Sequence, residues 1–203
     1  MGVNLQHYFI DKPHVDSDFF EFKDNVLDME LCFRSCDSIF SKNKIDDGTR
    51  SLLNAIYEKC NLFGKGLDLG CGLGVVGIVL IKKFNMQFDM VDINKTAVKL
   101  SKENVAKNNV LDSANVFYSD GFSEINKEYD FIVTNPPIKT GKQLLFKLME
   151  DSYNHLKSNG SLLLVIRKDH GMESLKKHIQ LIYGNCEIID RNKGFYILQA
   201  NKI

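Results

Sequence analysis

A rigid turn after an apolar segment offers two hydrogen-bond acceptors at one point of the chain. Residues 130–134 form a short apolar run that predicts a buried strand, and Asn135, Pro136 and Pro137 follow it. The prolines hold φ near about −65° and force extended backbone on the preceding residue. The Asn135 side-chain oxygen and the Pro136 carbonyl therefore lie on a stiff corner with no proline N–H beside them. Such a corner suits a planar amino group with two N–H donors, and an ordinary Asn-Pro turn is the alternative.

A glycine-rich turn is the second feature that could take part in binding or catalysis. Residues 68–77 read DLGCGLGVVG and lie between a predicted strand and a predicted helix. Glycines at such a junction let the backbone approach a ligand closely. Gly72, Gly74 and Gly77 fit the dinucleotide fingerprint, and Asp92 follows where a ribose-binding acid is expected. The pattern predicts a nucleoside cofactor, and the fingerprint alone leaves NAD open.

Alternating strand and helix patterns position these two turns. Repeated β-α units predict an α/β fold, a mostly parallel sheet with helices on both faces. A turn over only the four residues 191–194 connects the last two strands, and so short a connection joins only antiparallel neighbours. One terminal strand is therefore expected to run backward. The strands are expected at residues 66–69, 88–91, 115–118, 130–134, 161–167, 186–190 and 194–200, and the helices at residues 47–60, 75–84, 95–108, 142–156 and 173–183.

The N-terminal part of the chain has a different pattern. Short apolar and aromatic pieces separated by polar turns in residues 1–45 predict a small antiparallel β segment that caps the main sheet. Residues 46–203 are expected to form the cofactor-binding domain, within a single structural domain overall. Asp46 or Asp47 is the expected N-cap of the helix over residues 47–60.

Composition excludes several classes of protein. The 203 residues carry no formal net charge, which argues against a protein that wraps nucleic acid non-specifically. The five cysteines contain no C-x-x-C pair and the five histidines show no metal spacing, so we expect reduced thiols, no metal and a cytoplasmic location. Neither a signal-peptide pattern at the N-terminus nor an apolar run of about 18 residues is present, so no membrane span is expected.

The order of the motifs resembles a known enzyme superfamily. DLGCGLG, VDIN, SDGF and TNPPIK follow one another as in the class I S-adenosylmethionine-dependent methyltransferases. More narrowly, residues 40–53 and the IKTGK continuation at residues 138–142 resemble the small single-domain members of the small-subunit (16S) ribosomal RNA guanine-N2 methyltransferase family. The resemblance runs from His7 to Ala200. It implies a Rossmann-like class I methyltransferase sheet and S-adenosyl-L-methionine as the cofactor.

The resemblance also implies roles for the nucleoside end of the cofactor site. Asp92 would accept both ribose hydroxyls, and Ile93 would pack on the adenine face. Asp120 would accept a hydrogen bond from the adenine amino group, and Gly121 would allow the close turn there. An ordinary Asp-Gly turn is the competing interpretation for this last pair.

The methionine end of the cofactor is expected against the glycine turn. The resemblance implies that Gly70, Gly72 and Gly74 line this part. Asp68 would reach the cofactor amino group, either directly or through water. Thr49 is expected to cap the methionine end, and a plain helix-start turn explains Thr49 equally well.

Asn135, Pro136 and Pro137 are the expected catalytic group. An exocyclic amine is a poor nucleophile because its lone pair is delocalised into the ring. The Asn135 oxygen and the Pro136 carbonyl would hold both amine hydrogens and aim the lone pair at the sulfonium methyl, with no strong base required. Related amine methyltransferases have an aromatic residue after the prolines, where this chain has Ile138. Either an aliphatic contact replaces stacking, or Phe40 or an aromatic from residues 19–22 supplies it.

Lysines around these motifs predict contacts with RNA. Lys139, Lys142 and Lys147 follow the elbow, and Lys42 and Lys44 belong to the N-terminal motif. They would contact phosphates next to a flipped-out base, and a solvated helix face is the alternative.

The expected substrate is guanine N2 in small-subunit ribosomal RNA, either naked or in the 30S particle. Adenine N6 and a protein glutamine amide are alternatives within the methyltransferases, and Ile138 argues mildly against both. An NAD-binding oxidoreductase would leave the Asn-Pro-Pro elbow unexplained. A non-catalytic RNA-binding domain would not need the acids at positions 68, 92 and 120. The sequence leaves the oligomeric state open.

Overall fold

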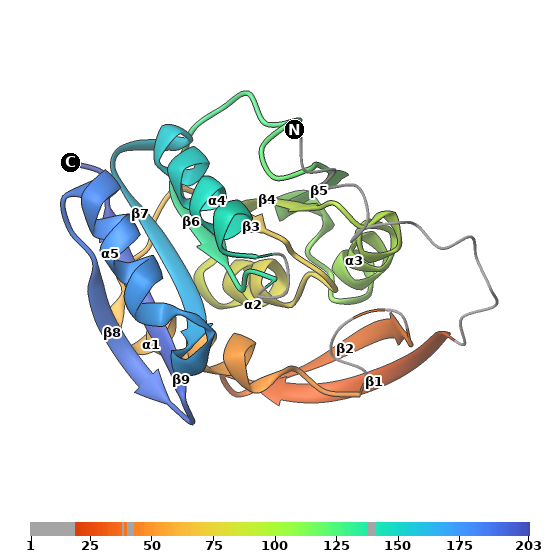
Figure 1. Cartoon of the computed structure of the whole chain (residues 1–203). Coiled ribbons are helices and arrows are strands. Elements are labelled where there is room, and N and C mark those ends of the chain that lie inside the picture. Colours follow the sequence, from red (N-terminus) through yellow and green to blue (C-terminus); the bar gives the residue numbers. More distant parts are fainter. Residues whose placement is uncertain (1–18, 38, 40–42, 138–140) are drawn as a thin grey trace.

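The structure is a computed structural model that describes residues 19–37, 39, 43–137 and 141–203. Its centre is a seven-stranded sheet with the order β5-β4-β3-β6-β7-β9-β8 (Figure 1). The strands of this sheet are β3 (Lys65–Leu69), β4 (Gln87–Asp92), β5 (Ala114–Tyr118), β6 (Tyr129–Thr134), β7 (Leu156–Arg167), β8 (Glu187–Asn192) and β9 (Phe195–Asn201). The helices are α1 (Asp47–Lys59), α2 (Val75–Phe84), α3 (Lys95–Lys107), α4 (Lys142–Asn154) and α5 (Met172–Tyr183).

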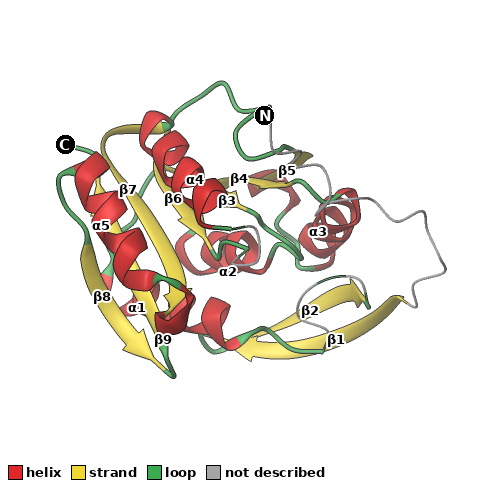
Figure 2. Cartoon of the chain, viewed as in Figure 1, coloured by secondary structure: helices red, strands yellow, loops and turns green. Residues whose placement is uncertain are grey.

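The sheet has the predicted mostly parallel topology. Strands β3 to β7 pair in parallel, and β9 pairs antiparallel with both β7 and β8. The reversed strand is the last in the chain and lies between β7 and β8. Helices cover both faces (Figure 2), because the buried strands carry apolar residues on both sides. In β7, Leu163 and Val165 pack in the core with α1 and α2, and Leu164 and Ile166 pack in the core with α4 and α5.

The predicted boundaries differ from the observed ones at the start of β7 and in the turn between β8 and β9, and by at most two residues elsewhere. β7 begins at Leu156 rather than at residue 161, so Gly160 lies inside a strand and not beyond the end of a helix. A Cβ at Gly160 would lie 2.8 Å from the Lys157 carbonyl oxygen, which explains the glycine. The turn between β8 and β9 contains two residues, Lys193 and Gly194, both with positive φ, instead of four. Two residues of this kind match the twist of antiparallel strands.

The predicted N-terminal β segment is a hairpin of β1 (Phe19–Val26) and β2 (Met29–Cys36). Its β2 edge is paired with side chains of α3 rather than with a strand. The Asn108 side chain accepts from Cys32 N at 3.2 Å and donates to the Cys32 carbonyl at 2.8 Å. Asn104 makes the same two bonds to Arg34, at 2.6 and 3.1 Å. Side-chain amides therefore satisfy a strand edge that would otherwise be open to another chain.

Asn104 also connects the hairpin to the glycine turn. Its Nδ2 donates a further hydrogen bond to the Leu73 carbonyl at 3.0 Å, and the whole side chain is buried. One amide thus holds β2, α3 and the turn that follows β3 in a fixed relation.

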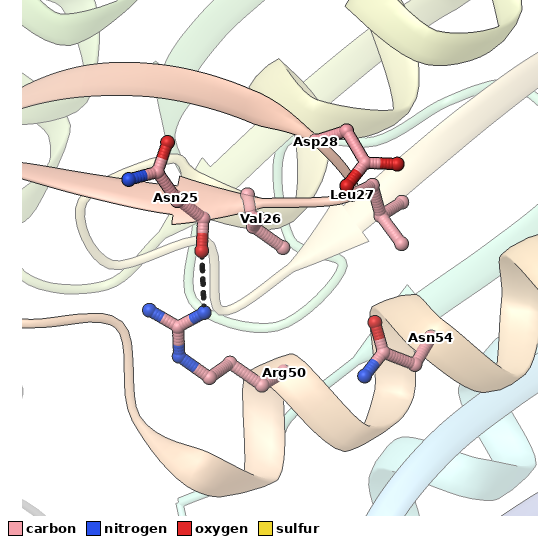
Figure 3. Close-up of a pocket in the computed structure, with 6 residues that line it drawn as sticks. All are labelled: Asn25, Val26, Leu27, Asp28, Arg50 and Asn54. Carbon is pink, nitrogen blue, oxygen red and sulfur yellow. Dashed lines mark hydrogen bonds between the residues drawn. The ribbon is translucent and has the colours of Figure 1, made fainter.

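The tip of the hairpin is fastened to α1. Arg50 forms an ion pair with Asp24. Figure 3 shows its second contact, a hydrogen bond donated to the Asn25 carbonyl at 2.6 Å. Asp24 also accepts from Ile45 N at 2.8 Å, and Arg50 Nε donates to the Ile45 carbonyl at 3.3 Å. The residue just before the N-cap of α1 is therefore clamped by the hairpin. These contacts border an open pocket lined by Asn25, Val26, Leu27, Asp28, Arg50 and Asn54.

Among the helices that the structure describes, none has the length and apolar character needed to cross a bilayer. No disulfide joins the five cysteines, all of which lie in the described part of the chain.

Replacing Asn104 by alanine is expected to lower the free energy of unfolding by about 3 kcal/mol, because the partly buried backbone of Arg34 and the buried carbonyl of Leu73 lose their partners. Chemical denaturation of both proteins measures the difference. Asn54→Ala is the matched control, since Asn54 is an exposed helical asparagine, and we expect a change below about 0.5 kcal/mol there. A similarly small effect at both positions would contradict the pairing of the hairpin edge with α3.

Candidate active site

The carboxyl ends of β3, β4 and β6 meet at one edge of the sheet, and the two turns predicted to do chemistry lie there. Gly70 N and Cys71 N both donate to the Val91 carbonyl at 2.9 Å, which fixes the glycine turn on β4. Thr134 Oγ1 donates to the Leu69 carbonyl at 2.7 Å, which fixes the start of the Asn-Pro-Pro elbow on β3. Both turns therefore face the same space beyond the strand ends.

The glycines of the turn divide into two kinds. Gly70 and Gly72 have φ of +76° and +55°, and a Cβ at either would meet no atom within 4 Å. Gly74 and Gly77 instead face packed atoms, because a Cβ there would lie 2.5 Å from Ser101 Oγ and 2.7 Å from Met90 Sδ, respectively. The first pair borders open space that a ligand can enter, and the second pair lets α2 pack closely on α3 and β4.

Asp92, at the end of β4, holds the turn with its carboxylate. Oδ2 accepts from Gly72 N at 2.9 Å and Oδ1 accepts from Asn94 N at 2.8 Å. Burial raises the pKa of Asp92, and these backbone donors oppose that shift. Ile93 N is a third backbone donor to this carboxylate. A carboxylate has about four acceptor positions, so capacity remains for a further partner. Ile93 is partly buried beside it.

Asp120 lies close to Asp92 because β5 runs beside β4. Ser119 N donates to the Asp92 carbonyl at 3.1 Å, and Asp120 follows with an exposed side chain. Gly121 has φ of +55°, and Ser119 Oγ donates to its carbonyl at 2.8 Å. The structure therefore brings together Asp92, Ile93, Asp120 and Gly121, the four residues expected at the nucleoside end.

Asp68 is a buried carboxyl within β3. Its Oδ2 accepts from Gly77 N at 3.0 Å. Burial raises the pKa of Asp68 to about 7; the Gly77 N–H opposes this and the negative charge of Asp92 adds to it. Within the described part of the chain, no lysine or arginine forms an ion pair with Asp68. Such a carboxyl favours either a proton or a cationic ligand.

Asn135 is held by the first turn of α1. Its Nδ2 donates to Thr49 Oγ1 at 3.0 Å and to Asp46 Oδ1 at 3.2 Å. Asp46 is the N-cap of α1 and accepts from Thr49 N at 3.0 Å through the same oxygen. The amide nitrogen therefore faces α1, which leaves the amide oxygen as the acceptor on the other side. Pro136 is buried and Pro137 is exposed.

Strands β7 and β9 extend beyond the end of β6 and form a wall beside Asn135. The last β6–β7 pair joins Thr134 to Leu164, and Arg167 pairs with Phe195 three residues further on. The Arg167 guanidinium lies 5.4 Å from the centre of the Phe195 ring. A Cβ at Gly48 would lie 3.0 Å from that ring and 3.1 Å from Asp46 Oδ1, so Phe195 borders the turn that holds Asn135.

The wall of Arg167 and Phe195 was not predicted, and Asp46 was predicted only as a helix cap. The sequence alone does not place Phe195 beside Asn135, because that requires knowing that the last strand pairs with β7 and in which register. The aromatics proposed instead have other contacts: the Phe19 ring lies 4.9 Å from the Arg34 guanidinium carbon, and Phe22 packs on Phe33 with ring centres 5.6 Å apart.

The residues expected at the substrate lie partly outside the described residues and partly on α4. Phe40, Ile138 and Lys139 lie outside the described residues. Lys142 begins α4, and its ammonium lies 5.1 Å from the centre of the Phe146 ring. Lys147 forms an ion pair with Asp151 at 2.5 Å on the same helix.

The chain resembles known methyltransferases over most of its length. The family model "Methyltransferase small domain" matches residues 30–199. The uncharacterized protein YbxB of Bacillus subtilis (strain 168) is 34% identical, over 98% of this chain and 99% of its own. Ribosomal RNA small subunit methyltransferase C of Vibrio cholerae serotype O1 is 32% identical over 89% of this chain, which spans 53% of that protein.

A solved structure has the same fold. The T. thermophilus 16S rRNA N2 G1207 methyltransferase (RsmC), determined in complex with AdoMet and guanosine, superposes with a TM-score of 0.82 at 22% identity. The alignment covers 94% of this chain and 52% of that one, so the present chain spans about half the length of the RsmC proteins it matches. Because the family model covers most of the sequence and YbxB aligns along its whole length, the chain belongs to the methyltransferase small domain family.

Proposed function

We propose that this protein is an S-adenosylmethionine-dependent N-methyltransferase that acts on guanine N2 of small-subunit ribosomal RNA. The carrying observation is the Asn135 amide, whose nitrogen donates to Asp46 and Thr49 at the start of α1, which leaves its oxygen as the acceptor at the sheet edge that also holds the glycine turn. The relatives named for 16S ribosomal RNA methylation support the substrate class. The protein would act in the cytoplasm, on naked RNA or on the 30S particle.

The residues present fit the cofactor. Open space at Gly70 and Gly72 gives room for its methionine part, and the buried Asp68 carboxyl suits its ammonium group. The remaining acceptor positions of Asp92 suit a ribose diol, and the exposed Asp120 carboxylate suits an adenine amino group. When bound, S-adenosylmethionine supplies an electrophilic methyl group on sulfur. Thr49 Oγ1 already accepts from Asn135 Nδ2, so a contact of this hydroxyl with the methionine end of the cofactor would have to share or replace that hydrogen bond.

The protein's part in the reaction is to position the amine. The Asn135 oxygen and the Pro136 carbonyl would each accept one amine hydrogen, which turns the nitrogen lone pair toward the methyl group. The same dipoles stabilise the positive charge that develops on nitrogen. The product ammonium is acidic and loses its proton to solvent afterwards, so no strong base is needed.

The surroundings of Asn135 favour a nucleobase as substrate. A guanine amine is attached to a flat ring, and the Arg167 guanidinium, which lies over Phe195 and pairs with Asp169 at 3.2 Å, provides a flat, partly buried cationic surface on the neighbouring strands. Aromatic rings and guanidinium planes are the common stacking partners of splayed bases, and arginine also pairs with phosphate. Lys139 and Lys142 remain our candidates for contacts with flanking phosphates.

Incubation with tritiated S-adenosylmethionine tests this function. The substrates are 30S particles, naked small-subunit RNA and total cell protein, all from a strain that lacks the enzyme. We expect label in the RNA that co-migrates with N2-methylguanine after nuclease digestion. Label as N6-methyladenine or only in protein glutamine would contradict the proposed substrate. Failure to bind S-adenosylhomocysteine in titration calorimetry would contradict the cofactor as well.

Asn135→Ala is expected to reduce turnover by about 10²-fold or more, because the amine loses one of its two acceptors. Affinity for S-adenosylhomocysteine, measured by calorimetry, is expected to stay within about threefold of the parent value. Asn126→Ala is a control, since Asn126 is an exposed asparagine in the loop that precedes β6. An equal loss of cofactor affinity in Asn135→Ala would instead make Asn135 a structural residue.

Asp68 generates a pH-dependent prediction. Its folded-state pKa of about 7 lies above its value of 3.8 in the unfolded chain, so the folded protein holds a proton that the unfolded chain releases. The ligand-free protein should therefore lose stability as pH rises from about 4 to about 7, by roughly 2–4 kcal/mol from this group. Asp68→Asn, which can still accept from Gly77 N, should remove this loss in urea unfolding at pH 5 and pH 8.

The same variant tests the cofactor contact. An ionised Asp68 would pair with the ammonium group of S-adenosylhomocysteine, so the affinity of the parent protein should increase as pH rises through 7. Asp68→Asn should bind about 10-fold more weakly at pH 8, with little dependence on pH. The exposed Asp112→Asn is the matched control, and unchanged affinity in Asp68→Asn would exclude a direct contact.

A further inference from the structure

We propose that Asp46 is a positioning residue that determines which atom of the Asn135 amide faces the substrate. The proposal rests on the proposed function for Asn135 as an amine acceptor. An asparagine amide can rotate by half a turn and exchange its oxygen for its NH₂ group. In one orientation Asn135 accepts from an amine, and in the other its own hydrogens would meet the amine hydrogens. Amine methylation of the proposed kind needs the first orientation alone.

The two partners of Asn135 Nδ2 differ in what they can enforce. Thr49 Oγ1, at 3.0 Å, is a hydroxyl, which can either accept from the NH₂ group or donate to the amide oxygen. Asp46 Oδ1, at 3.2 Å, belongs to a carboxylate, which when ionised can only accept. A rotated amide would place its oxygen against the Asp46 carboxylate. Asp46 therefore selects the orientation, and Thr49 adapts to it.

Asp46 is itself held in place from both sides. The oxygen that meets Asn135 also accepts from Thr49 N at 3.0 Å, the N-cap bond of α1. Immediately before it, Ile45 is buried and its backbone is bonded to Asp24 and Arg50. The acceptor that sets the amide orientation is thus fixed by a helix start and by the hairpin. An N-cap alone would need neither the carboxylate charge nor the contact with Asn135.

Variants at position 46 separate the cap from the orientation. Serine, asparagine and aspartate are similarly good N-caps, so Asp46→Ser and Asp46→Asn should both keep α1 and the thermal stability. In Asp46→Asn the side chain keeps an oxygen at nearly the same distance from the backbone, so it can still accept from the Asn135 NH₂ group. The serine hydroxyl in Asp46→Ser lies closer to the backbone and can also donate to the Asn135 amide oxygen. We expect Asp46→Ser to lower kcat at least about 10-fold and Asp46→Asn to lower it about threefold, with KM for the cofactor nearly unchanged in both.

A double-mutant cycle tests whether the effect passes through Asn135. In the Asn135→Ala background, adding Asp46→Ser should change the residual kcat by less than about twofold. Asp47→Asn is the control, because Asp47 lies in the same helical turn and pairs with Lys193 at 3.6 Å on the surface. The control should leave kcat close to the parent value. An equal loss from Asp46→Ser in both backgrounds would overturn the proposal.

A spectroscopic measurement reads the orientation without any methyl transfer. The Asn135 side-chain NH₂ resonances can be assigned by ¹⁵N NMR as the pair that disappears in Asn135→Ala. In the parent protein both protons should exchange slowly with solvent, and Asp46→Ser should accelerate that exchange at least about 10-fold. Unchanged exchange would overturn the proposal. If no RNA is methylated while the exchange changes as expected, the proposed substrate fails and the role of Asp46 in orienting Asn135 stands.

Discussion

The hydrogen bonds from Asn135 to the start of α1 connect two segments that are 86 and 89 residues apart in the chain, and the site depends on them. The elbow after β6 is stiff because of its prolines, but stiffness alone does not fix the rotation of a side-chain amide. That rotation is set from a different element, whose N-cap is in turn held by the hairpin. Contacts from the N-terminal hairpin to α1, and from α1 to the elbow after β6, therefore jointly fix the Asn135 amide.

The local parts of this arrangement could be predicted from the sequence. The helix over residues 75–84 was predicted with its observed bounds, because glycines before it and Asn85 after it mark both ends. The glycine turn and Asp92 follow from short-range spacing, and Asp46 as a helix cap follows from its residue type. The antiparallel last strand follows from the short loop before it, although the turn itself is two residues shorter than predicted.

The remaining parts of the site depend on contacts between segments far apart in the chain, and no local sequence pattern predicts them. Phe195 and Arg167 become neighbours only through the pairing of β9 with β7, and a sequence without a known register does not give that pairing. The sequence also does not distinguish glycines that border ligand space from glycines that allow close packing, since Gly70 and Gly74 occupy similar positions in the motif. Only the surroundings show that one borders open space and the other faces Ser101. The early start of β7 was missed because polar residues at 157–159 resemble a loop.

The clamp between Asp24, Ile45 and Arg50 has a consequence for how the protein can be divided. A chain cut at residue 46 would keep every residue expected to touch the cofactor or the amine. It would lose Ile45 together with the Asp24 carboxylate that pairs with Arg50, and also the strand edge that Asn104 and Asn108 satisfy. The hairpin contributes no reacting group, yet it belongs to the scaffold of the active site. For an engineer who seeks a minimal enzyme of this family, it is the last part to remove.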